Sequence, residues 1–251
     1  MNQRTVAIFL VSLATLIYGV TFTIAKDVMP IYVKPFGFIF VRVTGATAIF
    51  WLVGLFVKTE KIEKQDYKNI LLAAYFGIAL NMMTFFKGLS LTTPISASVM
   101  MVTSPIMVLL FSSFILKERI VRRKIIGIVV GLLGTVILIT YGNSSDDTAT
   151  NPTLGNFLVF VNAASYGLYL VLVKNIISKY SPITFIKWFY LFGLILVIPF
   201  GFSEFSEISW ATMPTSIYLK VGFVVVFTTC LTYLFNLYGL SKLKPTTVSV
   251  F

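Results

Sequence analysis

An arginine stands inside a stretch of sequence that is otherwise apolar. Arg42 lies seven residues after Pro35, in a run with no other charge before Lys58. Because a helix rises about 1.5 Å per residue, the guanidinium lies about 10 Å along a helix that begins at Pro35. A guanidinium presents a fork of donors that suits a carboxylate or a phosphate. Arg42 is therefore predicted either to bind an anionic group of a substrate or to extend to the outer membrane interface.

Three asparagines and two tyrosines share this apolar setting. The amides need hydrogen-bond partners in hydrocarbon, so they are predicted either to line a polar cavity or to join helices. The tyrosines, each followed by glycine, are predicted either to contact a substrate by stacking or through the hydroxyl, or to pack between helices. The predicted substrate-binding residues are Tyr18, Arg42, Asn81, Asn162, Tyr166 and Asn236.

The residue types that most catalytic and metal chemistry needs are scarce. The sequence has no histidine and one cysteine, Cys230, which removes the commonest general base and metal ligand. The acidic residues all lie in links or at the ends of apolar runs, so proton coupling through a buried acid is not expected. There is no glycine-rich phosphate loop with a lysine. The sequence therefore predicts no catalytic residue, metal or cofactor, and it argues against an enzyme and an ATP-driven pump.

The composition indicates an integral membrane protein. Of the 251 residues, 57% are hydrophobic and 12% are charged, whereas roughly a quarter of the residues in a soluble domain are charged. Apolar runs of about 20 residues have the length of a membrane-spanning helix. The predicted spans are 5–25, 35–57, 67–86, 94–116, 124–141, 154–173, 182–202 and 216–238, and a ninth begins at Pro245.

Proline and hydroxyl residues mark where several of these helices should begin. Proline suits the first helical turn, where the amide that it lacks would have no partner. A preceding serine or threonine can cap the same turn. The predicted starts are Pro35, Pro94, Pro182 and Pro245, with Thr93 and Ser181 as N-caps.

The lysines and arginines are divided unequally between the two sides of the membrane. With the N-terminus placed inside, most of them fall in inner links, whereas Lys26, Lys34, Lys87 and Lys220 fall outside. This asymmetry predicts a cytoplasmic N-terminus. The net charge of +11 is therefore attributed to membrane orientation and not to nucleic-acid binding. Lys187, beside Trp188, is predicted to extend to the interface. The predicted partners are the lipid bilayer and a small-molecule substrate, and the oligomeric state is left open.

The sequence repeats itself. Gly88-Leu89-Ser90 recurs 151 residues later as Gly239-Leu240-Ser241, and each copy is interpreted as a link that leads through a proline into an apolar helix. Tyr18-Gly19 recurs as Tyr166-Gly167 at an offset of 148. Helix one therefore matches helix six. Since five helices per copy is an odd number, the second copy must enter the membrane from the opposite face, as in many secondary transporters.

The predicted division is a first repeat over residues 1–145 and a second over 152–251. The same offset places the counterpart of Tyr141, at the end of the first repeat, beyond Phe251. We therefore expect the rest of helix nine and helix ten to be missing, as in a fragment of a ten-helix protein. The alternative is a chain whose second half is incomplete.

The end of the first repeat resembles a known family. The run from Pro105 to Glu118-Arg119, followed by Gly127 and by Gly131 to Gly134, is similar to the same region in EamA-type members of the drug/metabolite transporter superfamily. Arg42 lies where that family often has an arginine. The resemblance covers the whole chain in helix order, but the second Glu-Arg element and the tenth helix are absent. It implies an inner-membrane carrier built from two inverted five-helix repeats, which exports or exchanges metabolites such as amino acids.

Two features of that region are given structural roles. Glu118 is predicted to form a local ion pair at the end of helix four, and the glycines are predicted to let helices pack closely.

The sequence thus predicts an all-α, polytopic membrane helix bundle with two inverted-topology repeats, the second incomplete. The predicted function is secondary transport of small metabolites, such as amino acids or related zwitterionic and anionic solutes, by alternating access. The alternative is a non-transporting scaffold or a channel-like pore.

Overall fold

The computed structural model describes residues 2–117, 126–127, 129–131, 133–134, 136–137 and 149–251. This part of the chain forms helices and no strands, and seven of its helical stretches are long and apolar enough to cross a membrane. The spanning elements are α1 (Gln3–Val28), α2 (Pro35–Phe56), α3–η1–α4 (Asp66–Ala74, Tyr75–Ala79, Leu80–Leu91), α5–α6 (Pro94–Met101, Ser104–Ile115), α8 (Pro152–Ile176), α9 (Pro182–Ser206) and α10–η3–α11 (Thr215–Phe223, Val224–Leu231, Thr232–Lys242). Two short elements, η2 (Trp210–Thr212) and α12 (Pro245–Val248), complete the described structure.

The all-α membrane bundle is confirmed, and each of these seven spans coincides with a predicted one. The predicted span 124–141 and Glu118 lie largely or wholly outside the described residues. Of the predicted glycine face, Gly131 approaches Ile106, whereas Gly127 and Gly134 have open space beside them.

The Gly-Leu-Ser copies were wrongly interpreted as links. Gly88 to Ser90 belongs to the last turns of α4, and Gly239 to Ser241 belongs to those of α11. The helices continue past Lys87 and Tyr238 because the remaining turns still bury Leu89 and Leu240. The true link before each following proline is only two residues long.

The predicted helix starts are confirmed. Each of the four prolines stands at the first helical position of its element. The Thr93 hydroxyl accepts a hydrogen bond from the Ser96 amide at 3.1 Å, and the Ser181 hydroxyl accepts one from the Thr184 amide at 3.4 Å. These are the capping contacts that a helix N-terminus needs.

Three spans are not uniform α-helices. The third and the eighth each contain a π-helical segment, η1 and η3. The fourth is interrupted between Met101 and Ser104, just before Pro105. A proline inside a span removes one backbone hydrogen bond and kinks the helix. A π-helical turn holds one additional residue and shifts the side chains that follow it.

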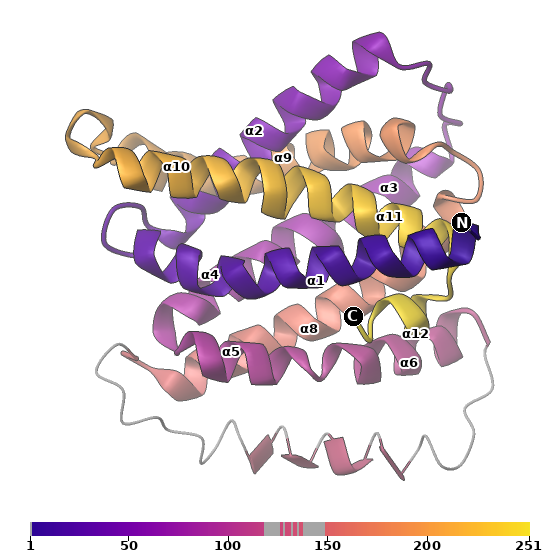
Figure 1. The fold of residues 1–251 in the computed structure, drawn as a ribbon, viewed down its shortest axis with the longest axis horizontal. Helices are drawn as coiled ribbons and strands as arrows, with labels where there is room; N and C mark the ends of the chain where they lie inside the picture. Colours follow the sequence, from indigo (N-terminus) through magenta and orange to yellow (C-terminus); the bar gives the residue numbers. More distant parts are fainter. Residues whose placement is uncertain (1, 118–125, 128, 132, 135, 138–148) are drawn as a thin grey trace.

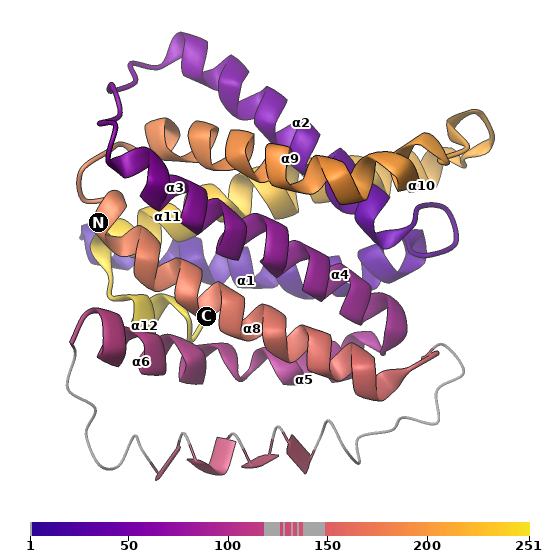
Figure 2. The ribbon, with the colours of Figure 1, turned by 180° about the vertical axis from the view of Figure 1, so that it is seen from behind.

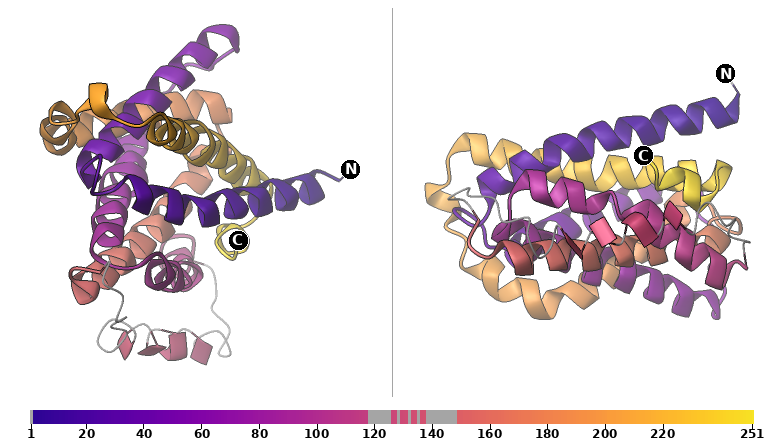
Figure 3. Two further views of the ribbon diagram at one scale, coloured as in Figure 1. Left: turned by 60° about the vertical axis from the view of Figure 1, so that its left-hand side comes forward. Right: turned by 90° about the horizontal axis from the view of Figure 1, so that it is seen from below.

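The most extensive contacts between helices join α2 to α9, followed by α4 to α8, and then α1 to α11 and α6 to α8. The first three of these pairs are antiparallel, whereas α6 and α8 run in the same direction (Figure 1). In Figure 1, α1 runs from the N-terminus at the right toward the left, whereas α8 runs from left to right. Figure 2 shows α4 beside α8 on the opposite side of the molecule. Seen from below, α1, α8 and α11 lie along roughly one direction, as helices that cross the same bilayer must (Figure 3).

The glycine of each Gly-Leu-Ser copy lies where two helices cross. Gly88 of α4 meets the backbone of Gly155 in α8, and Gly239 of α11 meets Val11 of α1. Small residues at such crossings let helix backbones approach closely. The repeated glycines therefore act at helix crossings.

A lysine covers the end of each of these helices. The Lys26 ammonium of α1 donates to the carbonyls of Leu89, Ser90 and Thr92, at 3.0 to 3.3 Å. The Lys174 ammonium of α8 donates to the carbonyls of Leu240 at 2.6 Å and Leu243 at 2.9 Å. The last carbonyls of a helix lack partners within the helix and carry partial negative charge, so an ammonium there is favourable.

Candidate functional site

Arg42 lies inside the bundle. Its side chain is 3% exposed, and its Nε donates to the Thr229 hydroxyl of η3 at 2.9 Å. The guanidinium carbon lies 4.6 Å from the centre of the Phe86 ring. Among the described residues no carboxylate forms an ion pair with Arg42, and this hydrogen bond is the one that its guanidinium makes. The site therefore holds a buried cation whose charge is not balanced by an ion pair there.

The predicted asparagines also lie where the two halves of the sequence meet. Asn81 of α4 donates to the carbonyl of Asn162 at 3.3 Å, and Asn162 of α8 donates back to the carbonyl of Asn81 at 2.9 Å. The Asn162 side-chain oxygen is buried without a hydrogen bond to the described residues. Asn236 of α11 donates to the Tyr18 hydroxyl of α1 at 3.1 Å. Each of these contacts joins a residue before 118 to one after 148.

The tyrosine Tyr166 faces an aromatic cluster at the centre of the bundle. Its ring lies 6.1 Å from that of Tyr169, which in turn packs at 5.3 Å on Phe189 and at 6.3 Å on Tyr233. Tyr18, Arg42 and this aromatic cluster all contact the span α10–η3–α11, at Asn236, Thr229 and Tyr233 respectively. The structure thus brings Tyr18, Arg42 and Tyr166 into one region, whereas Asn81 and Asn162 form a separate pair. Whether any of the six binds a substrate stays a prediction.

Threonines that the sequence analysis did not select also form contacts between the two halves. Thr228 and Thr229 stand side by side in η3, and the Thr228 hydroxyl lies 2.7 Å from that of Thr21 in α1. The Thr47 hydroxyl lies 3.2 Å from the carbonyl of Tyr190 in α9. Threonine is common in membrane helices, where its hydroxyl usually bonds to its own helix. In the sequence, Thr228 and Thr229 could have been noticed as an adjacent pair of hydroxyl residues in an apolar run.

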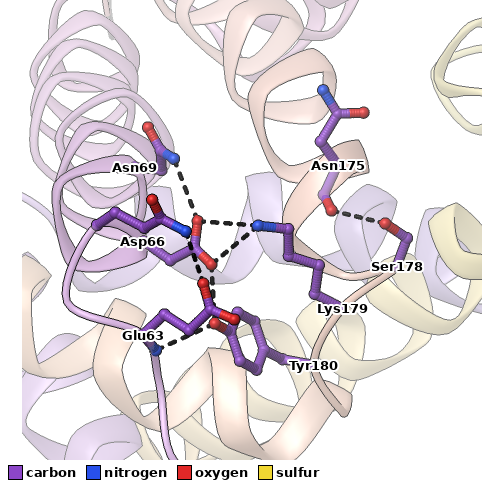
Figure 4. Close-up of polar contacts among 8 residues, drawn as sticks. Glu63, Asp66, Asn69, Asn175, Ser178, Lys179 and Tyr180 are labelled. Carbon is purple, nitrogen blue, oxygen red and sulfur yellow. Dashed lines mark hydrogen bonds and ion pairs between the residues drawn. The ribbon is translucent and has the colours of Figure 1, made fainter.

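Charged residues tie the halves together at the end of the bundle where α2 stops and α9 begins. Figure 4 shows the Lys179 ammonium and the Tyr180 hydroxyl converging on Asp66, at 3.1 and 2.8 Å from its Oδ2. The Tyr180 hydroxyl also accepts a hydrogen bond from the Glu63 amide at 3.1 Å. Asp66 is 4% exposed, and it is the one carboxylate buried in the described part of the chain.

A second acid contributes at the same end. The Glu60 carboxylate accepts hydrogen bonds from the hydroxyls of Thr184 and Ser181. These hydroxyls, that of Thr184 first, hold the pKa of Glu60 below its usual value. Nearby, the Lys187 ammonium donates to the Thr59 hydroxyl at 3.1 Å and lies 5.4 Å from the ring centre of Trp51.

The opposite end is tied in a different way. The Glu204 carboxylate of α9 accepts hydrogen bonds from the backbone amides of Phe36 and Gly37, whose nitrogens lie 2.7 and 2.9 Å from its Oε2. It therefore caps the first turn of α2. Lys34 pairs with Glu207, and Lys220 pairs with Asp27. A surface pocket of about 310 Å³ opens there. Its lining comes from the link before α2 and the segment that follows α9 and includes Pro30, Tyr32, Lys34, Glu204, Glu207 and Met213.

No group of three or more side chains suited to a metal ion is found in the part of the chain that the structure describes. The site as described offers hydrogen-bond donors, hydroxyls, aromatic faces and one unbalanced positive charge. Such an arrangement can bind and orient a small anionic or zwitterionic molecule, since a few placed polar groups in an apolar setting give specificity.

Known proteins that resemble this chain are named as transporters. It is 23% identical over 236 residues to "Uncharacterized transporter YyaM" of Bacillus subtilis (strain 168), which covers 93% of this chain and 77% of the relative. It is 26% identical over 240 residues to an "Uncharacterized transporter" of Archaeoglobus fulgidus, over 96% of this chain and 82% of that protein. A solved structure, titled "Crystal structure of protein", shares the fold with a TM-score of 0.65 at 19% identity, over 98% of this chain and 83% of the other.

The family comparison covers both halves of the chain. The model of the EamA-like transporter family matches residues 5–140 and 153–251. With seven described spans and relatives named as transporters, this match identifies a multi-pass membrane transporter. The chain belongs to the EamA-like transporter family.

Proposed function

We propose that this chain moves small zwitterionic or anionic metabolites, such as amino acids, across the cytoplasmic membrane. The observation that carries the proposal is Arg42, a buried cation with no ion-pair partner among the described residues. A charge inside a membrane is expensive unless it faces a partner or water, so such a residue points to function. A substrate carboxylate would supply the missing negative charge.

The surroundings of Arg42 support a binding role. Thr229 occupies Nε and Phe86 covers the guanidinium at 4.6 Å, so the side chain is held in place before any ligand arrives. Tyr18 and Tyr166 are proposed to offer a hydroxyl or a ring face to the rest of the ligand. We propose that Asn81, Asn162 and Asn236 line a cavity that forms between the halves when the transporter opens. Their alternative role is to join helices, as their present contacts do.

We propose that transport occurs by alternating access of two inverted repeats, over 1–145 and 152–251. The opposite directions of α1 and α8 support this arrangement (Figure 1). The helix contacts support it as well, because the first helix of each repeat packs on the third helix of the other repeat. α1 packs on α11, and its counterpart α8 packs on α4. The halves are tied at both ends of α2 and α9, by Asp66 with Lys179 and by Lys34 with Glu207. Opening either side would require one of these ties to break.

The orientation follows the distribution of charge. The basic residues of the inner links support a cytoplasmic N-terminus, which would place the Asp66 cluster inside and the 310 Å³ pocket outside. The residue types support transport without catalysis, metal or cofactor.

The experiment is a thermal-shift screen of the purified chain against amino acids, nucleosides and organic anions. We expect carboxylate ligands to raise the unfolding temperature, and Arg42→Gln to abolish these shifts. Lys187→Gln is the matched control, because it also removes a cation from a spanning helix. The Lys187 ammonium is hydrogen-bonded to the Thr59 hydroxyl and not to Thr229. Carboxylate shifts that survive Arg42→Gln would remove Arg42 from the site.

A second measurement separates a carrier from a pore. In a Cys230→Ala background, Asn81→Cys provides a single thiol between the halves. Access of impermeant thiol reagents from one side at a time supports a carrier, whereas simultaneous access from both sides supports a pore.

A further inference from the structure

The π-helical segment η3 places a hydroxyl beside Arg42. In a π-helix an amide bonds to the carbonyl five residues earlier, and the Thr232 amide does so with the carbonyl of Phe227. Within this segment the Thr229 hydroxyl donates to the carbonyl of Val224 at 2.8 Å. The Thr229 side chain is fully buried. Its hydroxyl proton is therefore committed to its own helix.

This commitment fixes the direction of the bond to Arg42. A hydroxyl has one donor and two acceptor lone pairs. Because the Thr229 hydroxyl donates its proton to the Val224 carbonyl, its lone pairs are free to accept a hydrogen bond from Arg42. The Nε atom of Arg42 lies 2.9 Å from the hydroxyl oxygen. The contact is a hydrogen bond from a charged donor, the stronger kind. It joins a helix of the first half to a helix of the second.

The bond also decides which edge of the guanidinium remains available. A carboxylate can approach either the edge formed by Nε and one Nη or the edge formed by both Nη atoms. Thr229 occupies Nε, and the Phe86 ring covers one face. The edge with both Nη atoms makes no hydrogen bond to any described residue. It is the edge suited to bidentate binding of an anion.

We propose that Thr229 is a positioning residue, which holds Arg42 by Nε so that its two Nη atoms face a substrate carboxylate. The proposal rests on the transport function proposed above. The first half contains a comparable segment, η1, whose carbonyls at Phe76 and Gly77 accept the Ser165 and Tyr233 hydroxyls at 2.6 and 2.8 Å. π-Helical turns are frequent at functional sites. Here both of them carry polar contacts between the halves.

The test compares three substitutions of similar size. Thr229→Val removes the hydroxyl at nearly constant volume, and Thr229→Ser keeps it. Thr228→Val is the matched control, because it removes the neighbouring contact with Thr21 without touching Arg42. The purified chain is titrated with L-glutamate and succinate. Loss of one hydrogen bond to a charged group predicts roughly 10-fold weaker binding for Thr229→Val, with little change for Thr229→Ser and Thr228→Val.

A second readout needs no ligand. In protein labelled with ¹⁵N-arginine, the Nε proton of Arg42 should exchange slowly with water in the wild type and in Thr229→Ser, and faster in Thr229→Val. The Arg42 signal is assigned by its loss in Arg42→Lys.

The two readouts distinguish the failures. Equal exchange of the Nε proton in wild type and Thr229→Val would overturn the positioning role, whatever the ligand. Equal carboxylate affinity of these two proteins would overturn it as well, while leaving Arg42 as the binding residue. Equal affinity in Arg42→Gln would instead remove Arg42 from the site, and a wild-type protein that binds no carboxylate would overturn the proposed function.

Discussion

The crossing of α4 and α8 should not accept one additional methyl group at Gly155. A Cβ at this position would lie 2.8 Å from the Cβ of Thr92, 2.9 Å from the Gly88 carbonyl oxygen and 2.9 Å from the Thr92 amide nitrogen. Two of these atoms belong to the backbone of the facing segment, so no rotamer change removes the clash. The helices must move apart.

The size of the effect follows from these distances. Overpacking a well-packed interface costs about 1–3 kcal/mol. Elsewhere in a helix, Gly→Ala stabilises by about 0.5–1 kcal/mol, since alanine loses less backbone entropy on folding. We therefore expect Gly155→Ala to lower the free energy of unfolding by about 1–3 kcal/mol. Gly239→Ala should cost less, because its nearest neighbour is the end of the Val11 side chain.

The matched control is Gly19→Ala in α1, where nothing lies within 4 Å of the added carbon. It should be neutral or slightly stabilising. Both proteins are unfolded in mixed micelles by increasing sodium dodecyl sulfate, and helix content is followed by circular dichroism. If Gly155→Ala proves as stable as Gly19→Ala, α4 and α8 do not cross at the distance described, and the close approach of Gly88 and Gly155 is refuted.

Three further predictions concern the polar contacts. Tyr18→Phe should lower the free energy of unfolding by about 1–3 kcal/mol, because the buried amide of Asn236 loses its acceptor; unchanged stability in the same micelle assay would mean that the amide finds another partner. Asp66→Ala should destabilise the protein more than Lys179→Ala, because Asp66→Ala also removes the acceptor of the Tyr180 hydroxyl. Lys179 is 51% exposed, so its ion pair with Asp66 is worth only about 0.2–1 kcal/mol. A double-mutant cycle of Asp66→Ala and Lys179→Ala measures the energy of the ion pair. Hydrogen bonds from Thr184 and Ser181 lower the pKa of Glu60 in the folded protein. The Glu60 carboxylate therefore stabilises the fold above the unfolded-state pKa of about 4.3, and this contribution is lost as the pH falls through the lower folded-state pKa. Between about pH 6 and about pH 3, the unfolding temperature should therefore fall less in Glu60→Gln than in the wild type.

Much of the fold could be read from the sequence because it depends on local patterns. A run of about 20 apolar residues is long enough to span a bilayer wherever it occurs. Proline at a first turn and a hydroxyl before it act within a few residues, and Pro35, Pro94, Thr93 and Ser181 behaved accordingly. The charges inside apolar runs could be noticed in the same way, so Arg42 was selected. The ends of the third and eighth spans were misplaced because a helix continues when its final turns still bury apolar residues, here Leu89 and Leu240.

The tertiary structure decided which polar groups meet. Residues 187 positions apart, Arg42 and Thr229, form one hydrogen bond, and nothing in their neighbouring sequence encodes that pairing. The π-helical turns that place Thr229, the Asn81–Asn162 pair and the buried carboxylate of Asp66 likewise depend on which helices pack together. Apolarity determines that a helix lies in the membrane. The direction in which each of its polar side chains points is set by the crossings with its neighbours, because only there can a buried polar group find a partner.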